Sequence, residues 1–69
     1  MNPFAPVSTP YGKGIISARQ VDKDGNQIGG WCVRIKRADY QRNYPGIPNC
    51  DGTHIYITCS EDQVREIGA

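Results

Sequence analysis

Two segments of the chain, residues 31–36 and 53–59, alternate between apolar and polar side chains. The positions on one side of these segments are Trp31, Val33, Ile35, Ile55, Ile57 and Cys59. Those on the other side are Cys32, Arg34, Lys36, His54, Tyr56 and Thr58. A period of two is typical of a β-strand with one face buried and one face in water. The pattern therefore predicts two half-buried strands and assigns each side chain to a face.

Further strands flank these two. Residues 15–21 are rich in β-branched side chains and lack helical spacing, which predicts a strand. Asp24-Gly25 is a strong hairpin signal, and Gln27 and Ile28 begin the returning strand. Gly29-Gly30 interrupts that strand and indicates a bulge or sharp bend.

Turn chemistry dominates the second half of the chain. Residues 38–51 form a polar loop in which Tyr44-Pro45-Gly46 suits a type II turn. Asp51-Gly52 is a second turn before the strand at 53–59. Ser60 followed by Gln63 is a capping-box pattern, which predicts one helical or 3-10 turn before a last short strand at 64–67.

These elements predict an all-β fold, a small closed barrel of about five short antiparallel strands with one helical or 3-10 turn near the C-terminus. At 69 residues the chain has room for one domain, which we place at 11–69. Prolines at positions 3, 6 and 10 predict an extended N-terminal arm over residues 1–10. The expected core is Ile16, Ala18, Ile28, Trp31, Val33, Ile35, Ile55, Ile57, Val64 and Ile67.

Composition and charge narrow the functional classes only slightly. The net charge of +1 provides no global attraction to nucleic acid or membranes, so any preference must come from local arrangement. Three cysteines without CxxC spacing favour reduced thiols, and with one histidine they predict no metal site. The first ten residues do not resemble a signal peptide, and no apolar run is long enough to span a bilayer. We therefore expect a cytoplasmic protein without a membrane partner.

The polar side of the two alternating segments is the most informative surface. If the strands are neighbours, Arg34 and Lys36 lie beside His54 and Tyr56. Cationic groups beside planar rings suit an anionic, flat-faced ligand, and Arg37 and Arg42 could extend the surface into the loop. A solvated sheet face of mixed polarity is the alternative interpretation.

Two loop tyrosines give a further candidate surface. Tyr40 and Tyr44, with Tyr11, could line a groove for an extended peptide, or they could cover the ends of the barrel. The acidic residues fall mostly in turns and suggest no catalytic pair, and we predict no cofactor.

The segment Tyr11–Ile16 resembles the aromatic-Gly-x-Gly-x-hydrophobic opening of Tudor- and KOW-like barrels, which belong to the SH3-like class. In that group the glycines let the chain turn tightly into the first strand. The resemblance implies an SH3-like barrel that binds nucleic acid or protein.

A second resemblance is to plasmid-type (type II) dihydrofolate reductases, which are SH3-like barrels. Gln27–Trp31 is similar to that family's Q-I-x-G-W segment, and His54–Tyr56 falls where the family has Q-I-Y. This resemblance implies a homotetramer that binds folate and NADPH in a central pore. His54 replaces the family's glutamine, and the pore lysine would fall near Ala18 or Arg19.

Three hypotheses follow. The leading one is a small non-catalytic binding module for nucleic acid or protein that uses Arg34, Lys36, His54, Tyr56, Tyr40 and Tyr44. The alternative is the reductase-like homotetramer, and the third is an accessory protein that occludes a partner's surface. Oligomeric state separates the second from the others.

Overall fold

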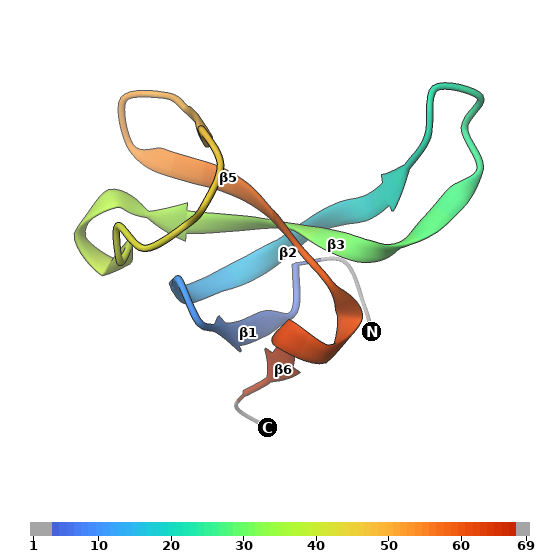
Figure 1. The fold of residues 1–69 in the computed structure, drawn as a ribbon. Helices are drawn as coiled ribbons and strands as arrows, with labels where there is room; N and C mark the ends of the chain where they lie inside the picture. The colour runs from blue at the N-terminus through green and yellow to red at the C-terminus, as the bar shows by residue number, and fades with distance from the viewer. Residues whose placement is uncertain (1–3, 68–69) are drawn as a thin grey trace.

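The computed structural model describes residues 4–67, which form one antiparallel sheet of six strands (Figure 1). The strands are β1 (Pro6–Thr9), β2 (Gly12–Val21), β3 (Gln27–Lys36), β4 (Asn49–Cys50), β5 (His54–Cys59) and β6 (Arg65–Glu66). Their order in the sheet is β4-β5-β3-β2-β1-β6, so the sheet is open, with β4 and β6 at its edges. The all-β class and the antiparallel arrangement predicted from the sequence are confirmed. The predicted closed barrel of about five strands is instead an open sheet of six, because β4 and β6 do not pair with each other.

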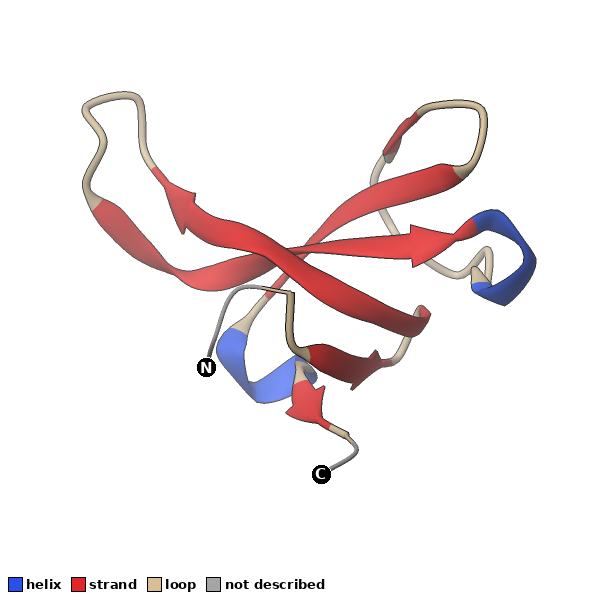
Figure 2. Ribbon diagram, turned by 180° about the vertical axis from the view of Figure 1, so that it is seen from behind, coloured by secondary structure: helices blue, strands red, loops and turns tan. Residues whose placement is uncertain are grey.

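Two 3-10 turns, η1 (Arg37–Asp39) and η2 (Glu61–Gln63), are the only helical elements of the described residues (Figure 2). The predicted turn before the last strand is η2. Its capping box is present, since the Ser60 backbone N–H donates to Gln63 Oε1 at 3.1 Å. The first turn, η1, was not predicted from the sequence.

The hairpin of β2 and β3 is the longest unit of the fold, with ten residues in each strand. The predicted turn closes it: Asp22 Oδ1 accepts the backbone N–H groups of Asp24 and Asn26, each at 2.9 Å, and Gly25 has φ 86°. Gly29 and Gly30 both have φ 83°, so the predicted bend lies inside β3. The turn end of the hairpin therefore bends away from the rest of the sheet (Figure 1).

The N-terminal segment differs from the predicted arm. Residues 6–9 form β1, which pairs with β2 on one side and with β6 on the other. Val7 is completely buried, so β1 belongs to the domain that was expected to start at residue 11. Pro6 is compatible with the sheet because it is the first residue of its strand. The predicted arm's residues 1–3 lie outside the described residues.

The core contains seven of the ten predicted side chains and four others. Buried apolar side chains are Ala5, Val7, Tyr11, Ile16, Trp31, Val33, Ile35, Ile55, Ile57, Cys59 and Val64. Ala18 is exposed because a register shift between Ile16 and Ala18 breaks the alternation from which it was predicted. Ile28 is 55% exposed because it lies in the bent end of the hairpin, and Ile67 is half-buried.

Candidate functional site

The structure pairs the four outward residues of β3 and β5 directly. Arg34 lies opposite Tyr56, and Lys36 lies opposite His54, in an antiparallel register that holds from residue 31 to residue 36. Directly opposite side chains on one face of such a pair have Cβ atoms about 4.5–5.5 Å apart. The condition under which these four residues would lie together, that their strands are neighbours, is therefore met.

The Arg34–Tyr56 pair belongs to a row that crosses five strands. Ile15 on β2 lies opposite Arg34, and Pro6 on β1 lies opposite Ile15. Beyond Tyr56, the row ends at Asn49 on β4. We call Pro6, Ile15, Arg34, Tyr56 and Asn49 the central row.

A second row of basic side chains runs beside the central row. Lys36 and His54 lie two residues along their strands from Arg34 and Tyr56, so all four project from the same face. On β2, Lys13 lies two residues from Ile15 and is exposed. We call Lys13, Lys36 and His54 the basic row, and its distance from the central row is about 6.7 Å at the usual rise of a strand.

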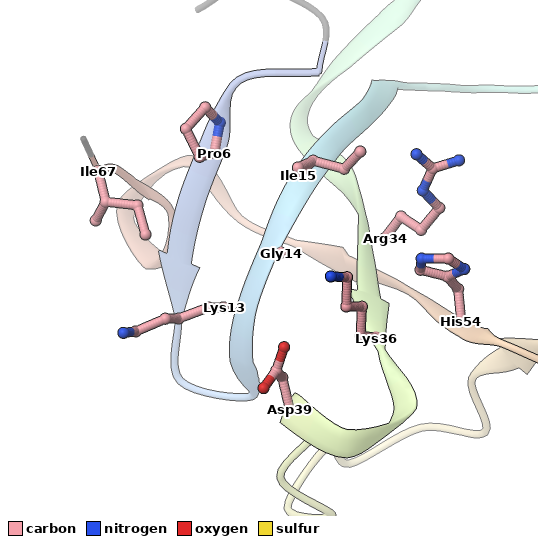
Figure 3. A pocket seen from close by; sticks show the side chains of 9 residues that line it. All are labelled: Pro6, Lys13, Gly14, Ile15, Arg34, Lys36, Asp39, His54 and Ile67. Atoms are coloured by element: carbon pink, nitrogen blue, oxygen red, sulfur yellow. The ribbon is translucent and has the colours of Figure 1, made fainter. Parts of the chain in front are cut away.

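The basic row and the Pro6, Ile15 and Arg34 part of the central row line an open groove with a volume of about 280 Å³ (Figure 3). Its lining residues are Pro6, Lys13, Gly14, Ile15, Arg34, Lys36, Asp39, His54 and Ile67. The Arg34 and His54 side chains lie next to each other on one side, while the Asp39 carboxylate lies between Lys13 and Lys36 (Figure 3). Lys13, Arg34 and Lys36, together with His54, thus share the groove with a single carboxylate, and this excess of basic groups favours an anionic ligand.

The basic groups of the groove have no ionic partner in the described part of the chain. The one salt bridge among residues 4–67 joins Arg19 to Glu61, on another part of the surface. Arg34 Nε is shielded from water and makes no hydrogen bond to any residue in 4–67. A shielded guanidinium N–H without an acceptor is costly, and Arg19 Nε, outside the groove, is in the same situation.

Asp51 organises the strand end that carries His54 and Tyr56. Its Oδ1 accepts the backbone N–H groups of Thr53 at 2.8 Å and His54 at 2.7 Å, and its Oδ2 accepts the Tyr56 hydroxyl at 2.9 Å. These bonds, led by that from Thr53, lower the pKa of the Asp51 carboxyl far below its ordinary value of 3.8. The ring of Tyr56 is thereby held in place on the face.

The same contact changes the acidity of Tyr56. Its bond to Asp51, together with partial burial, raises the pKa of the Tyr56 hydroxyl above 10.0, and Arg34 opposes that shift in part. Tyr56 is therefore a neutral aromatic group at neutral pH. On the other side of Asp51, His54 Nδ1 lies 2.8 Å from Thr53 Oγ1, so the imidazole is also anchored.

Tyr40 and Tyr44 are not among the residues that line this groove. The Tyr44 ring meets Tyr11 edge-on, with centroids 5.1 Å apart and an interplanar angle of 87°, and its hydroxyl lies 3.0 Å from Thr58 Oγ1. Tyr40 packs against the core and lines an adjoining hollow, which shares Lys13 and Asp39 with the groove. The structure does not bring the two predicted loop residues onto the face of Arg34, Lys36, His54 and Tyr56.

The flanking arginines also differ in position. Arg37 donates from Nη1 to the backbone oxygen of Asp51 at 3.1 Å, which joins η1 to the turn before β5. Arg19, one of the two positions that could correspond to a pore lysine, covers the Trp31 ring. Arg42 is exposed in the loop.

Six of the nine groove residues were not predicted from the sequence as site residues: Pro6, Lys13, Gly14, Ile15, Asp39 and Ile67. The alternation of residues 13–16 was a signal for Lys13 and Ile15, because it places them on the face of β2 that does not carry the buried Ile16. Pro6 had no signal, because its strand was predicted as an arm. Asp39 enters the groove through η1.

No group of three His, Cys, Asp or Glu side chains within residues 4–67 is arranged to hold a metal ion. The three cysteines are free thiols: Cys50 is exposed, Cys32 is half-buried and Cys59 is buried. Burial, with a smaller contribution from Cys32, raises the pKa of the Cys59 thiol to about 11. None of the described helical segments has the length and apolar character needed to cross a membrane.

Comparisons with known proteins add no identification to this geometry. No protein-family model matches the chain, and neither a curated protein nor a solved structure matches it.

Proposed function

We propose that this protein is a small non-catalytic module that binds nucleic acid through the face formed by the central and basic rows. The observation that carries this proposal is the cross-strand grouping of Arg34 and Lys36 with Tyr56 and His54. Lysine and arginine bind phosphate by charge-assisted hydrogen bonds, and aromatic rings provide stacking area for bases.

The position of the groove favours nucleic acid over an extended peptide. Peptides that add to a sheet need the unpaired backbone of an edge strand. Here the groove lies across the faces of β1, β2, β3 and β5, all four of which have a partner on both sides. Its lining offers mainly side chains and excess positive charge, which suits a ligand recognised by charge and planarity.

We also propose that the fold is a variant of the SH3-like class. Two features support this: η2 precedes the last strand, and that strand pairs with the first, Val7 lying opposite Glu66. The pairing of β6 with β1 brings the ends of the described chain together (Figure 1).

The reductase-like homotetramer is a second candidate, supported by the outward position of His54 and Tyr56 on β5. The groove of one copy, about 280 Å³, is at the lower limit of sites that hold a single drug-sized ligand. Folate and a nicotinamide cofactor together therefore require several copies around a shared cavity. Sedimentation that shows a monomer at micromolar concentration would eliminate this candidate.

A binding titration at two salt concentrations tests the leading proposal. The probes are a fluorescent single-stranded oligonucleotide and its duplex, and the variants are Lys36→Gln and Lys23→Gln. Lys36 is in the basic row, whereas Lys23 is exposed in the hairpin turn. Lys36→Gln should weaken binding and reduce the salt slope by about 1, because it removes one phosphate contact.

The control variant Lys23→Gln should bind as the wild type does, although it loses the same charge. Equal losses for the two variants would show that net charge alone attracts the oligonucleotide. Absence of binding to both probes, or binding that does not change with salt, would refute the proposal.

A further inference from the structure

The central row places three side chains with stacking or apolar surfaces on neighbouring strands. Ile15, Arg34 and Tyr56 are successive cross-strand neighbours, and all three are half-buried. Neighbouring strands lie about 4.8 Å apart, so the three side chains form a continuous strip about 10 Å long. A guanidinium plane and a phenol ring both stack on nucleobases.

The strip is also held in a fixed arrangement. Tyr56 donates to Asp51 at 2.9 Å, which limits rotation of the phenol. Arg34 lies directly opposite Tyr56 in the register of β3 and β5, so the two side chains are neighbours on this face. A surface ordered before binding loses less conformational entropy when a ligand covers it.

The basic row runs parallel to this strip, at a separation of about 6.7 Å along the strands. Lys13 and Lys36 are exposed, so their ammonium groups can follow a phosphate backbone. A nucleotide carries its phosphate and its base on different sides of the sugar. One strand of nucleic acid can therefore set its phosphates on the basic row and its bases on the central row.

A duplex cannot use both rows in this way. Its bases are paired and stacked inside the helix, and only their edges are accessible in the grooves. It would contact Lys13 and Lys36 through phosphates and leave the surfaces of Ile15 and Tyr56 uncovered. Unpaired bases, in contrast, can stack on the side chains of the central row.

We propose that this face selects single-stranded over double-stranded nucleic acid, with unpaired bases stacked on Ile15, Arg34 and Tyr56 and phosphates on Lys13 and Lys36. This inference rests on the proposed nucleic-acid binding and specifies its ligand. The preference for the single strand comes from the central row, since the basic row attracts the phosphates of single-stranded and double-stranded nucleic acid alike.

The decisive comparison is between Tyr56→Phe and Tyr56→Thr in the full chain. Both variants lose the hydroxyl bond to Asp51, and only Tyr56→Phe keeps a ring. Base–aromatic stacking predicts that Tyr56→Phe binds a single-stranded oligonucleotide about fivefold or more tightly than Tyr56→Thr does. The two variants should bind the matched duplex with similar affinity, because a duplex does not stack on the ring.

Ile15→Thr gives a second test that does not depend on the folding of a Tyr56 variant. It keeps a β-branched side chain and should also weaken single-strand binding without changing the salt slope. Val21→Thr is its control, because Val21 is exposed on the hairpin, outside both rows. Circular dichroism establishes that each variant is folded before affinities are compared.

The outcomes separate this inference from the proposed function. Salt-dependent binding that is as tight for the duplex as for the single strand, or equal single-strand affinity of Tyr56→Phe and Tyr56→Thr, would overturn the selectivity and leave the proposed function standing. Binding to neither probe would overturn both. A poly-glutamate peptide bound more tightly than the single strand would also overturn both, and would identify an acidic protein as the partner.

Discussion

The guanidinium carbon of Arg19 lies 4.3 Å from the centre of the Trp31 ring. The two residues face each other across β2 and β3, and Trp31 is only 8% exposed. The same guanidinium donates from Nη2 to Glu61 Oε1 at 2.9 Å. Arg19 thus covers the largest side chain of the core and connects the hairpin to η2.

Arg19→Ala should destabilise the protein by about 1 kcal/mol, because a cation stacked on tryptophan and partly shielded from water contributes about that much. Glu61→Gln should cost less, since the salt bridge is exposed, with 34% of the Arg19 and 58% of the Glu61 side chain accessible. Urea unfolding followed by tryptophan fluorescence measures both. A larger loss for Glu61→Gln would contradict this assignment and make the ion pair the dominant contact.

Gly14 lines the groove on β2, where its backbone lies close to Arg34 and Ile35 of β3. A Cβ at this position would collide with the backbone oxygen of Arg34 and would lie 2.8 Å from Ile35 Cγ1. Gly14→Ala should therefore cost about 1–3 kcal/mol, as other overpacked sites do, and should weaken ligand binding by displacing Arg34.

Gly52→Ala is the matched control for Gly14→Ala. Nothing within 4 Å would meet its Cβ, and Gly52 is not among the residues with positive φ. The free energy of unfolding of the Gly52→Ala variant should stay within about 0.5 kcal/mol of the wild-type value. Thermal unfolding of the two variants measures the difference, and equal destabilisation would show that the collision at Gly14 is relieved by small backbone shifts.

Asp51 predicts a pH dependence of stability. Because its pKa is lower in the folded chain than the ordinary value of 3.8, the unfolded chain binds the proton more readily. The stabilisation from Asp51 is complete above pH 3.8 and is lost as the pH falls below that value. Asp51→Asn should remove this dependence and should be less stable than the wild type at pH 7.

The measurement is urea unfolding of both proteins between pH 7 and acid. The difference in unfolding free energy between wild type and Asp51→Asn should shrink on acidification. A difference that stays constant with pH would mean that the carboxylate is not stabilised by Thr53, His54 and Tyr56 in solution.

The predictable part of the site followed from strict alternation. In β3 and β5 a period of two assigns every side chain to a face, and their pairing then determines which residues meet. Only the pairing itself had to come from the structure. Arg34, Lys36, His54 and Tyr56 were identified for this reason.

The unpredicted parts depend on three-dimensional context. Ala18 was assigned to the core because alternation from Ile16 was continued through a register shift that no residue type marks. Tyr44 was open to two interpretations, a peptide groove or a cover for the end of the barrel. Only the structure shows that the Tyr44 ring packs edge-on against the buried Tyr11. Lys13 and Ile15 join the site because β2 lies beside β3 in a specific register.

β1 was missed because Pro6, with Pro3 and Pro10 on either side of the strand, resembles the proline pattern of an extended arm. The contribution of β1 to the fold depends on one side chain. Val7 is completely buried between β2 and β6, whereas Val21 is 50% exposed on the hairpin. Val7→Ala should cost about 2 kcal/mol through lost burial and the cavity that remains, and Val21→Ala should cost much less. Both changes remove the same two methyl groups from a strand residue, so β propensity changes equally and burial alone differs. Urea midpoints that coincide for the two variants would show that residues 6–9 are not packed in the domain, and the arm predicted from the sequence would then be the correct description.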